Sequence, residues 1–170
     1  MKAKRDAFCD PETIRKQAFY ISKYVYAIYD TKPLVRGHVV VIPKRHVEYF
    51  HEMSHDEVKD MMDAIVTITR KLSGIYKLKP LAYNIISQAG PYSGRTVRHL
   101  HVHIIPRRKG DMFAADGSTK SYDDLVFRVY ALEKRTNLDN MPLIKQVRKL
   151  GKKEYEREIS ILRESFGDKK

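Results

Sequence analysis

Three histidines alternate with apolar residues in one short segment, His99-Leu100-His101-Val102-His103. Side chains at positions i, i+2 and i+4 of a β-strand point to one face of a sheet, at intervals of roughly 6.6 Å. A strand here would place the three imidazoles in one row and pack the apolar side chains on the opposite face. Because unpaired imidazoles are costly to bury, the pattern indicates that these rings have a polar task.

A polar surface, a metal site and a catalytic site are the three interpretations of this row. A polar surface alone does not account for the strict alternation of three histidines. Two histidines at i and i+2 can ligate zinc or iron, but on a regular strand the outer pair would lie roughly 13 Å apart. The segment holds no acidic residue, and it is flanked by basic residues that would repel a cation: Arg95, Arg98, Arg107, Arg108 and Lys109.

Nucleophilic catalysis on phosphorus fits the same residues. A neutral imidazole is a good nucleophile near pH 7, and neighbouring histidines can orient it or donate protons. The flanking cations would bind phosphate groups and stabilise the charge of the transition state. Local chemistry therefore favours catalysis over metal binding, and both interpretations stay open at this point.

The elements that must position the histidines indicate an α+β fold. Aromatic and β-branched runs predict strands over 24–29, 38–42, 81–87 and 97–105, the last of which carries the histidines. A long helix is predicted to open at the capping box 54–57 and to end before Pro80. Further helices are predicted over 11–17, 123–132 and 152–166.

Length and composition indicate one compact domain: the chain has 170 residues, of which 42% are hydrophobic. We expect a catalytic part over 1–118 and, within the same domain, a C-terminal helical extension over 119–170. Cys9 is the only cysteine, which excludes a disulfide framework and fits a reducing compartment. Because the sequence shows no secretory signal and no apolar run of roughly 18–20 residues, we expect a cytoplasmic or nuclear protein with no membrane segment.

The formal net charge of +12 favours polyanionic partners such as nucleotides. Basic residues of the C-terminal tail are mixed with glutamates and are typical of a solvated surface, whereas those beside the histidines would attract phosphate. A nucleotide is therefore the expected partner, and direct binding of nucleic acid is not expected.

Two separate segments resemble one known family. Residues 94–107 resemble the signature of the histidine triad superfamily, and residues 32–46 resemble its upstream segment, in which Gly37-His38 supplies a fourth histidine. The resemblance covers residues 8–113 and implies an antiparallel sheet with a long packed helix. The continuation 106–111 and the long C-terminal tail are similar to the fragile-histidine-triad branch, the dinucleoside polyphosphate hydrolases.

The resemblance implies a role for each histidine. His101 would attack the α-phosphorus of a dinucleoside polyphosphate and form a covalent nucleotidyl-histidine, which water then hydrolyses. His99 would orient the nucleophile, and His103 and His38 would contact phosphate oxygens or assist the leaving group. The matching phosphate-binding residues are Gln88, which also positions water, and Thr96.

The resemblance also implies a nucleoside pocket. Asp30 stands where the family binds ribose hydroxyls, a task that suits a carboxylate acceptor. Ile28 and Val40 match apolar walls of the base pocket, and Phe8 would close it. Plain core packing is the alternative for these three apolar residues.

Two positions depart from the family. Arg95 stands where glutamine is common, and it would either grip a distal phosphate or point to solvent. Cys9 matches half of a zinc-binding Cys-x-x-Cys of some relatives, but Asp6 replaces the first cysteine, so no metal site is expected. No protein-bound cofactor is required, and a divalent cation bound with the substrate phosphates is compatible with the resemblance.

The resulting hypothesis is a homodimeric hydrolase that converts diadenosine tri- or tetraphosphate to AMP and the remaining nucleotide. One alternative is a nucleoside phosphoramidase or adenylyl-conjugate hydrolase that uses the same histidine. Another, from a different class, is a nucleotide-sensing protein with weak turnover.

Overall fold

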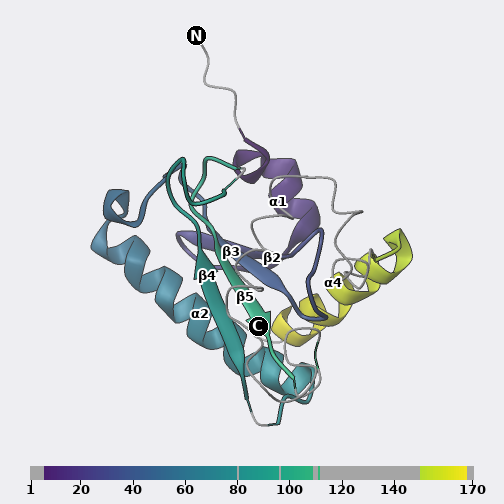
Figure 1. Cartoon of the computed structure of the whole chain (residues 1–170). Coiled ribbons are helices and arrows are strands. Elements are labelled where there is room, and N and C mark those ends of the chain that lie inside the picture. The colour runs from purple at the N-terminus through teal and green to yellow at the C-terminus, as the bar shows by residue number, and fades with distance from the viewer. Residues whose placement is uncertain (1–5, 80, 96, 109–110, 112–149, 168–170) are drawn as a thin grey trace, which may run out of the picture.

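A five-stranded antiparallel sheet organises the molecule (Figure 1). The computed structural model describes residues 6–79, 81–95, 97–108, 111 and 150–167. The strands follow the spatial order β1-β2-β3-β5-β4, and every neighbouring pair is antiparallel. Their bounds are β1 (Ala18–Ile21), β2 (Val25–Tyr29), β3 (Val39–Pro43), β4 (Tyr83–Ser87) and β5 (Val102–Pro106). The antiparallel α+β fold is confirmed.

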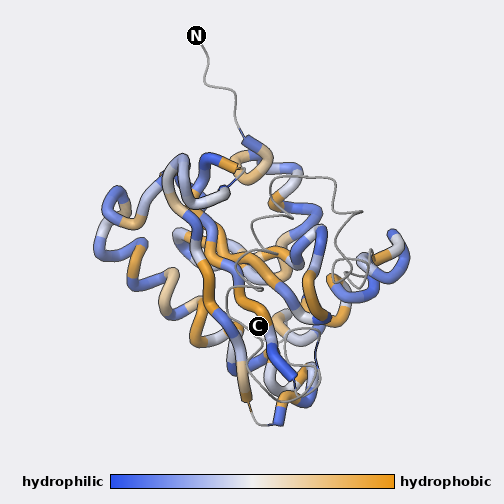
Figure 2. Tube along the Cα trace, in the orientation of Figure 1, coloured by the Kyte–Doolittle hydropathy of each residue, from blue (hydrophilic) through white to orange (hydrophobic). Residues whose placement is uncertain are grey.

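Helices cover both faces of the sheet. Alternate side chains of β2 separate into two cores: Val25, Ala27 and Tyr29 pack with α2 (His55–Ile75) and α4 (Lys152–Gly167). Tyr26 and Ile28 face the other side, where α1 (Pro11–Gln17) and the short 3-10 helix η1 (Ala7–Cys9) lie. All five residues of β2 are therefore buried, and the apolar strands run through the centre of the molecule (Figure 2).

Helix α2 begins at the predicted capping box. The Ser54 hydroxyl accepts from the Glu57 N–H at 3.3 Å, and the Glu57 carboxylate accepts from the Ser54 N–H at 2.8 Å. Ile68 is fully buried, whereas Met62 is 52% exposed, because the buried face of the helix is centred on the side that carries Met61.

The C-terminal helix belongs to the main core. Ile159 and Leu162 of α4 pack in the same cluster as the α2 residues, and the Arg163 guanidinium donates to the Ala18 carbonyl of β1. The predicted boundary at residue 118 and the helix predicted over 123–132 lie outside the described residues. Among the helices that the structure describes, none is long and apolar enough to cross a membrane.

The predicted histidine strand is wrong in its extent. Strand β5 begins at Val102, so only His103 lies on it, and His99 and His101 precede it. The reason is that Leu100 donates its N–H to the Val47 carbonyl at 2.6 Å, outside the strand ladder. A second difference is β1, a short strand that follows α1 directly and was not predicted.

A candidate active site beside a cluster of metal-ligating side chains

His103 and His38 form a buried pair at the centre of the sheet. His103 lies opposite Val40 of β3 and Ile86 of β4, and the His38 ring lies just before β3. The Leu34 N–H donates to His38 Nδ1 at 3.2 Å, which places the His38 proton on Nε2. That proton points to His103 Nδ1 at 3.0 Å, so the His103 proton lies on Nε2. The pairing leaves His103 with an N–H donor on the ring nitrogen opposite His38.

His101 is oriented by its own main chain. Its Nδ1 lies 2.7 Å from the His99 carbonyl oxygen, and a carbonyl accepts only, so Nδ1–H donates. The lone pair of the neutral ring is therefore on Nε2, the atom that a nucleophilic role requires. The ring is buried, and its edge contacts the rings of His103 and Phe8 at centroid distances of 5.1 and 5.6 Å.

Asp30 lies against the two paired histidines. Its Oδ2 is 3.5 Å from His38 Nε2 and 3.5 Å from His103 Nδ1, and its Oδ1 accepts from the Lys32 N–H at 2.7 Å. Burial alone would raise the pKa of Asp30, but its attraction to His38 and the hydrogen bond from the Lys32 N–H hold that pKa below the usual value. Burial lowers the pKa of His38 to about 4, although the Asp30 carboxylate opposes this shift. At neutral pH this group therefore holds a neutral His38 beside an ionised Asp30.

The predicted base-pocket residues lie together on the same face. Ile28 and Val40 are paired across β2 and β3, and Phe8 packs against the cluster that contains them. They are contiguous with the histidine rings through Phe8, which contacts His101. This placement fits both a pocket wall and core packing.

The side chains of Gln88 and Arg95 differ in whether all their polar atoms have a partner. Gln88 is buried, and its Nε2 donates to the Ser93 carbonyl at 2.8 Å. In the described part of the chain its Oε1 has no hydrogen-bond partner. Arg95 forms a partly buried ion pair with Glu48 and donates to the Glu48 carbonyl at 3.1 Å. The expectation that Arg95 points to solvent is wrong, and a distal phosphate would have to compete with Glu48 for its guanidinium. Thr96 lies outside the described residues.

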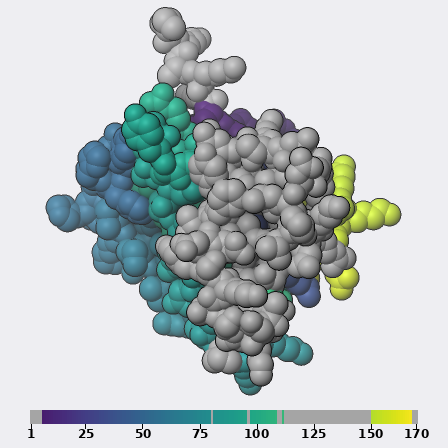
Figure 3. Space-filling view, viewed as in Figure 1, coloured from purple at the N-terminus to yellow at the C-terminus, as the bar shows by residue number. Residues whose placement is uncertain are grey.

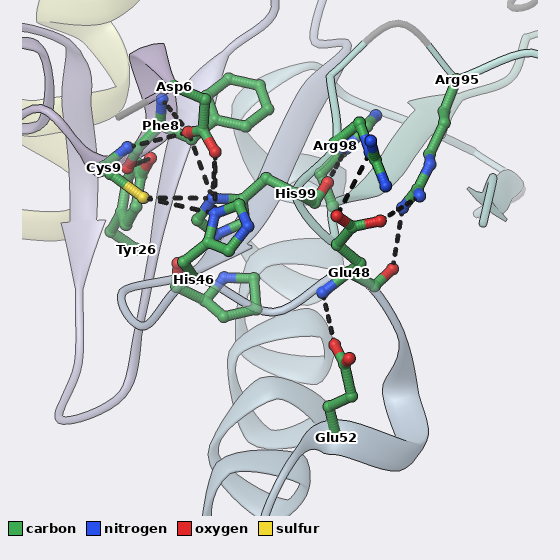
Figure 4. Close-up of polar contacts among 12 residues, drawn as sticks. Asp6, Phe8, Cys9, Tyr26, His46, Glu48, Glu52, Arg95, Arg98 and His99 are labelled. Atoms are coloured by element: carbon green, nitrogen blue, oxygen red, sulfur yellow. Dashed lines mark hydrogen bonds and ion pairs between the residues drawn. The ribbon is translucent and has the colours of Figure 1, made fainter. Parts of the chain in front are cut away.

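His99 turns away from the other two histidines of the triad. Its Nε2 donates to the Pro43 carbonyl at 2.9 Å, and its Nδ1 faces three other side chains (Figure 4). Together these four residues form what we call the Asp6 cluster: Asp6, Cys9, His46 and His99. One ligand atom from each lies within 4.8 Å of all the others.

The sequence analysis expected no metal site, because the segment 99–103 holds no acidic residue and because Asp6 stands where relatives have the first cysteine of a zinc motif. The fold supplies an acidic residue from a distance: Asp6 comes from the N-terminal segment and is 93 positions away from His99. His46 is a residue that sequence reasoning missed, although it ends the upstream segment that resembles the family. Glu48 was missed as well, and its ion pairs with Arg95 and Arg98 reveal it. The Asp6 cluster thus offers one sulfur, two nitrogens and one carboxylate, a donor set that suits zinc.

A family model described as the HIT domain matches residues 12–110. The chain belongs to the HIT domain family. The match includes all the residues assigned to the triad and to the nucleoside pocket except Phe8. It leaves α4, which packs against β1 and β2, outside the HIT domain.

Relatives and solved structures agree with this assignment. The bifunctional bis(5'-adenosyl)-triphosphatase/adenylylsulfatase FHIT of Arabidopsis thaliana is 33% identical over 124 residues, 73% of this chain and 66% of that protein. The bis(5'-adenosyl)-triphosphatase of Saccharomyces cerevisiae is 39% identical over 97 residues, 56% of this chain and 46% of that protein. The chain therefore matches about half to two thirds of the length of these HIT relatives.

A hypothetical histidine triad nucleotide-binding protein from Sulfolobus tokodaii has the same HIT fold. It superimposes with a TM-score of 0.66 and 25% identity, and the alignment covers 96% of this chain and 93% of that one. Because this alignment covers almost the whole chain, the structural similarity extends beyond residues 12–110, which the family model matches.

Proposed function

We propose that this protein hydrolyses dinucleoside polyphosphates, such as diadenosine tri- or tetraphosphate, through a nucleotidyl-His101 intermediate. The observation that carries the proposal is the hydrogen bond from His101 Nδ1 to the His99 carbonyl, because it places the lone pair of the ring on Nε2, the atom that would attack phosphorus. The names of the plant and yeast relatives support the same substrate class.

The first step is an in-line displacement. His101 Nε2 forms a bond to the α-phosphorus, and the bond from phosphorus to the bridging oxygen breaks. The electron pair leaves with that oxygen on the departing nucleotide, which is ADP when the substrate is diadenosine triphosphate. The Nε2–H of His103 donates to a phosphate oxygen and offsets the charge that develops there, and His38 keeps His103 in this tautomer.

The second step returns the enzyme to its starting state. A water oxygen bonds to phosphorus, the phosphorus–nitrogen bond breaks, and the electron pair returns to His101 Nε2 while a water proton passes to solvent. The unsatisfied Oε1 of Gln88 can accept a hydrogen bond from that water. Asp30 accepts from ribose hydroxyls once the nucleotide is bound, and Ile28, Val40 and Phe8 contact the base.

Substrate preference separates this proposal from its main alternative. The name of the plant relative includes adenylylsulfatase activity, which favours adenylyl conjugates as the second candidate class. Turnover should be measured with diadenosine triphosphate, diadenosine tetraphosphate, adenosine phosphoramidate and adenylyl sulfate at equal concentrations. We expect the highest kcat/KM with one of the two dinucleotides; hydrolysis of the phosphoramidate or the sulfate alone would contradict the proposal.

We also propose a homodimer joined at the β4 edge. Strand β4 ends the described sheet, and its Tyr83 and Ile85 are exposed. Ile85 lies opposite Ile104, whose side chain is in the α2 core, so it faces the same side as the exposed Met62 and Val66 of α2. Figure 3 shows the surfaces of α2 and of the segment that carries β4 side by side at the left of the view.

A further inference from the structure

We propose that Glu158 of α4 is a positioning residue of the active site: its buried carboxylate holds the turn before His38, and through it the His38–His103 pair. Glu158 lies outside residues 12–110, which the family model matches. Its contacts stand on the geometry alone. Their effect on turnover rests on the proposed function, because it takes His38 and His103 as parts of the hydrolytic machinery.

The loop between β2 and β3 carries a residue of the site at each end, Asp30 and His38. The Asp30 N–H donates to the His38 carbonyl at 3.0 Å, and the His38 N–H donates to the Val35 carbonyl at 3.1 Å. The Leu34 N–H, which fixes the tautomer of the His38 ring, belongs to the same loop. A shift of the turn 34–37 would therefore move the donor that orients His38.

Glu158 holds this turn from the outside. Its Oε1 accepts from Arg36 Nε at 2.7 Å, and its Oε2 accepts from the Tyr76 hydroxyl at 2.7 Å. Arg36 lies in the turn, and Tyr76 is the residue at which α2 ends. One carboxylate thus joins the His38 loop, the end of α2 and α4, which meet at this side of the sheet (Figure 1).

Tyr76 transmits a second contact from Glu158 to the turn. Gly37 has a φ of +91°, and a Cβ at this position would lie 2.8 Å from Tyr76 Cε2, so the ring lies directly against the turn. Burial and the hydrogen bond to Glu158 raise the pKa of the Tyr76 phenol, which therefore stays protonated and donates. The Arg36 guanidinium also packs on this ring, 5.4 Å from its centroid.

Stability alone is a poor reason for a carboxylate in this place. The next buried residues of α4, Ile159 and Leu162, are apolar and pack in the core. Desolvation of a buried carboxylate offsets much of what an ion pair contributes, so an apolar side chain at position 158 would stabilise the helix packing about as well. The carboxylate adds two directed hydrogen bonds. Directed bonds are what a turn that sets the tautomer of His38 requires.

The same face of α4 also holds the other end of the loop. Tyr155 precedes Glu158 by one helical turn, and its hydroxyl donates at 3.2 Å to the carbonyl of Tyr29, the residue before Asp30. The Tyr29 hydroxyl accepts in turn from the Gly37 N–H at 3.3 Å. Helix α4 therefore contacts the chain on both sides of the loop that carries Asp30 and His38.

The tautomer of His38 tests the contact without any assay of activity. In the full-length wild type we expect the ¹⁵N resonances of His38 to show the Nε2–H form. Glu158→Leu keeps an apolar side chain in the core but removes both hydrogen bonds, and it should give a mixture of the two His38 tautomers. Glu156→Leu is the matched control, because Glu156 is exposed on the same helix, and it should behave as the wild type. An unchanged His38 tautomer in Glu158→Leu would overturn the positioning role.

Arg36→Gln removes the same ion pair from the side of the loop. The Arg36 side chain is 56% exposed, so this variant should fold even where Glu158→Leu does not. With diadenosine triphosphate we expect Glu158→Leu to lower kcat about tenfold and Arg36→Gln to lower it about threefold or more, while KM changes less than about twofold. The double variant should be no slower than Glu158→Leu, because both substitutions remove one contact.

Three outcomes separate this proposal from its rivals. A kcat of Glu158→Leu equal to that of the folded Glu156→Leu would overturn the positioning role. A rise of KM confined to Arg36→Gln would make Arg36 a phosphate ligand instead and would also overturn it. A wild type that hydrolyses no dinucleotide, combined with a changed His38 tautomer in Glu158→Leu, would support the contact and contradict the proposed function.

Discussion

Each histidine ring of the site is distinguished by the main-chain group it contacts. His38 accepts from the Leu34 N–H, His99 donates to the Pro43 carbonyl, and His101 donates to the His99 carbonyl. These bonds assign a different tautomer and a different reactive nitrogen to chemically identical side chains. The spacing of the histidines predicted their importance, but it could not predict these assignments, because they depend on how the backbone folds around each ring: Leu34 is only four residues from His38, whereas Pro43 is 56 positions from His99.

The burial of His38 leads to a prediction for how the free energy of unfolding depends on pH. Its pKa is lowered to about 4 in the folded protein, whereas an unfolded histidine titrates near 6.5. Between these values the unfolded chain binds a proton that the folded chain does not, so the free energy of unfolding falls as pH falls from 6.5 towards 4. We expect His38 to account for a loss of about 2 kcal/mol between pH 7 and pH 5.

Urea unfolding of wild type and His38→Asn at both pH values measures this contribution. Asparagine keeps an acceptor for the Leu34 N–H but does not titrate. The loss between pH 7 and pH 5 should shrink by about 2 kcal/mol in the variant, and it should be unchanged in the exposed control His55→Asn. Equal losses in wild type and His38→Asn would show that His38 does not titrate as described.

At the scale of the elements, the sequence predicted helices and strands correctly where it carries strong local signals such as helix caps and β-branched runs. The helix starts at Asp10-Pro11 and at Ser54 are confirmed, and so are the central strands. Strand β1 was missed because its four residues follow α1 without a turn signal, and α4 helps to hold it in place. The histidine segment alternates like a strand, yet His99 and Leu100 bond to Pro43 and Val47 instead of continuing the ladder.

The contacts of Glu57 at the start of α2 lead to a prediction for the stability of the protein. The Glu57 carboxylate accepts from the Ser54 N–H and from the Arg45 guanidinium at 2.8–2.9 Å. The hydrogen bonds from Arg45 come first among the causes that lower its pKa to about 2. Glu57→Gln should reduce the free energy of unfolding by about 1–2 kcal/mol, because both the cap and the ion pair weaken.

Asp56→Asn is the control for this prediction. Asp56 is the neighbouring acid in the first turn of α2, and it is exposed. Chemical denaturation should show a loss of less than about 1 kcal/mol in this variant, which removes an interaction with the helix dipole and the exposed attraction to Lys23 and Lys59. Losses of equal size in the two variants would contradict a specific role for Glu57.

On the scale of the whole molecule, the two faces of the sheet are specialised. Helices α2 and α4 bury one face, while η1, α1 and the histidines occupy the other. The family resemblance predicted this architecture, and the C-terminal extension proves to share its core through Ile159 and Leu162. The sequence singled out Asp6 and Cys9 of the Asp6 cluster without predicting a metal site, and only the fold brings His46 and His99 to them.

The β4 edge makes a prediction for oligomeric state. A charge at the proposed interface should separate the subunits, so Ile85→Lys should elute as a monomer in size-exclusion chromatography with light scattering. Ile21→Lys is the control, because Ile21 is an exposed apolar residue on β1, at the opposite edge of the sheet, and it should stay dimeric. A monomeric wild type, or a dimeric Ile85→Lys, would contradict the proposed dimer.

The central claim is that His101 Nε2 attacks phosphorus, and trapping the intermediate tests it most directly. Diadenosine triphosphate labelled at the α-phosphorus is mixed with the protein, quenched within milliseconds and analysed by peptide mass spectrometry. We predict AMP attached to His101 through an acid-labile, base-stable phosphorus–nitrogen bond, and no label or turnover in His101→Ala. Turnover by the wild type without label on His101, or turnover by His101→Ala at the wild-type rate, would contradict the account.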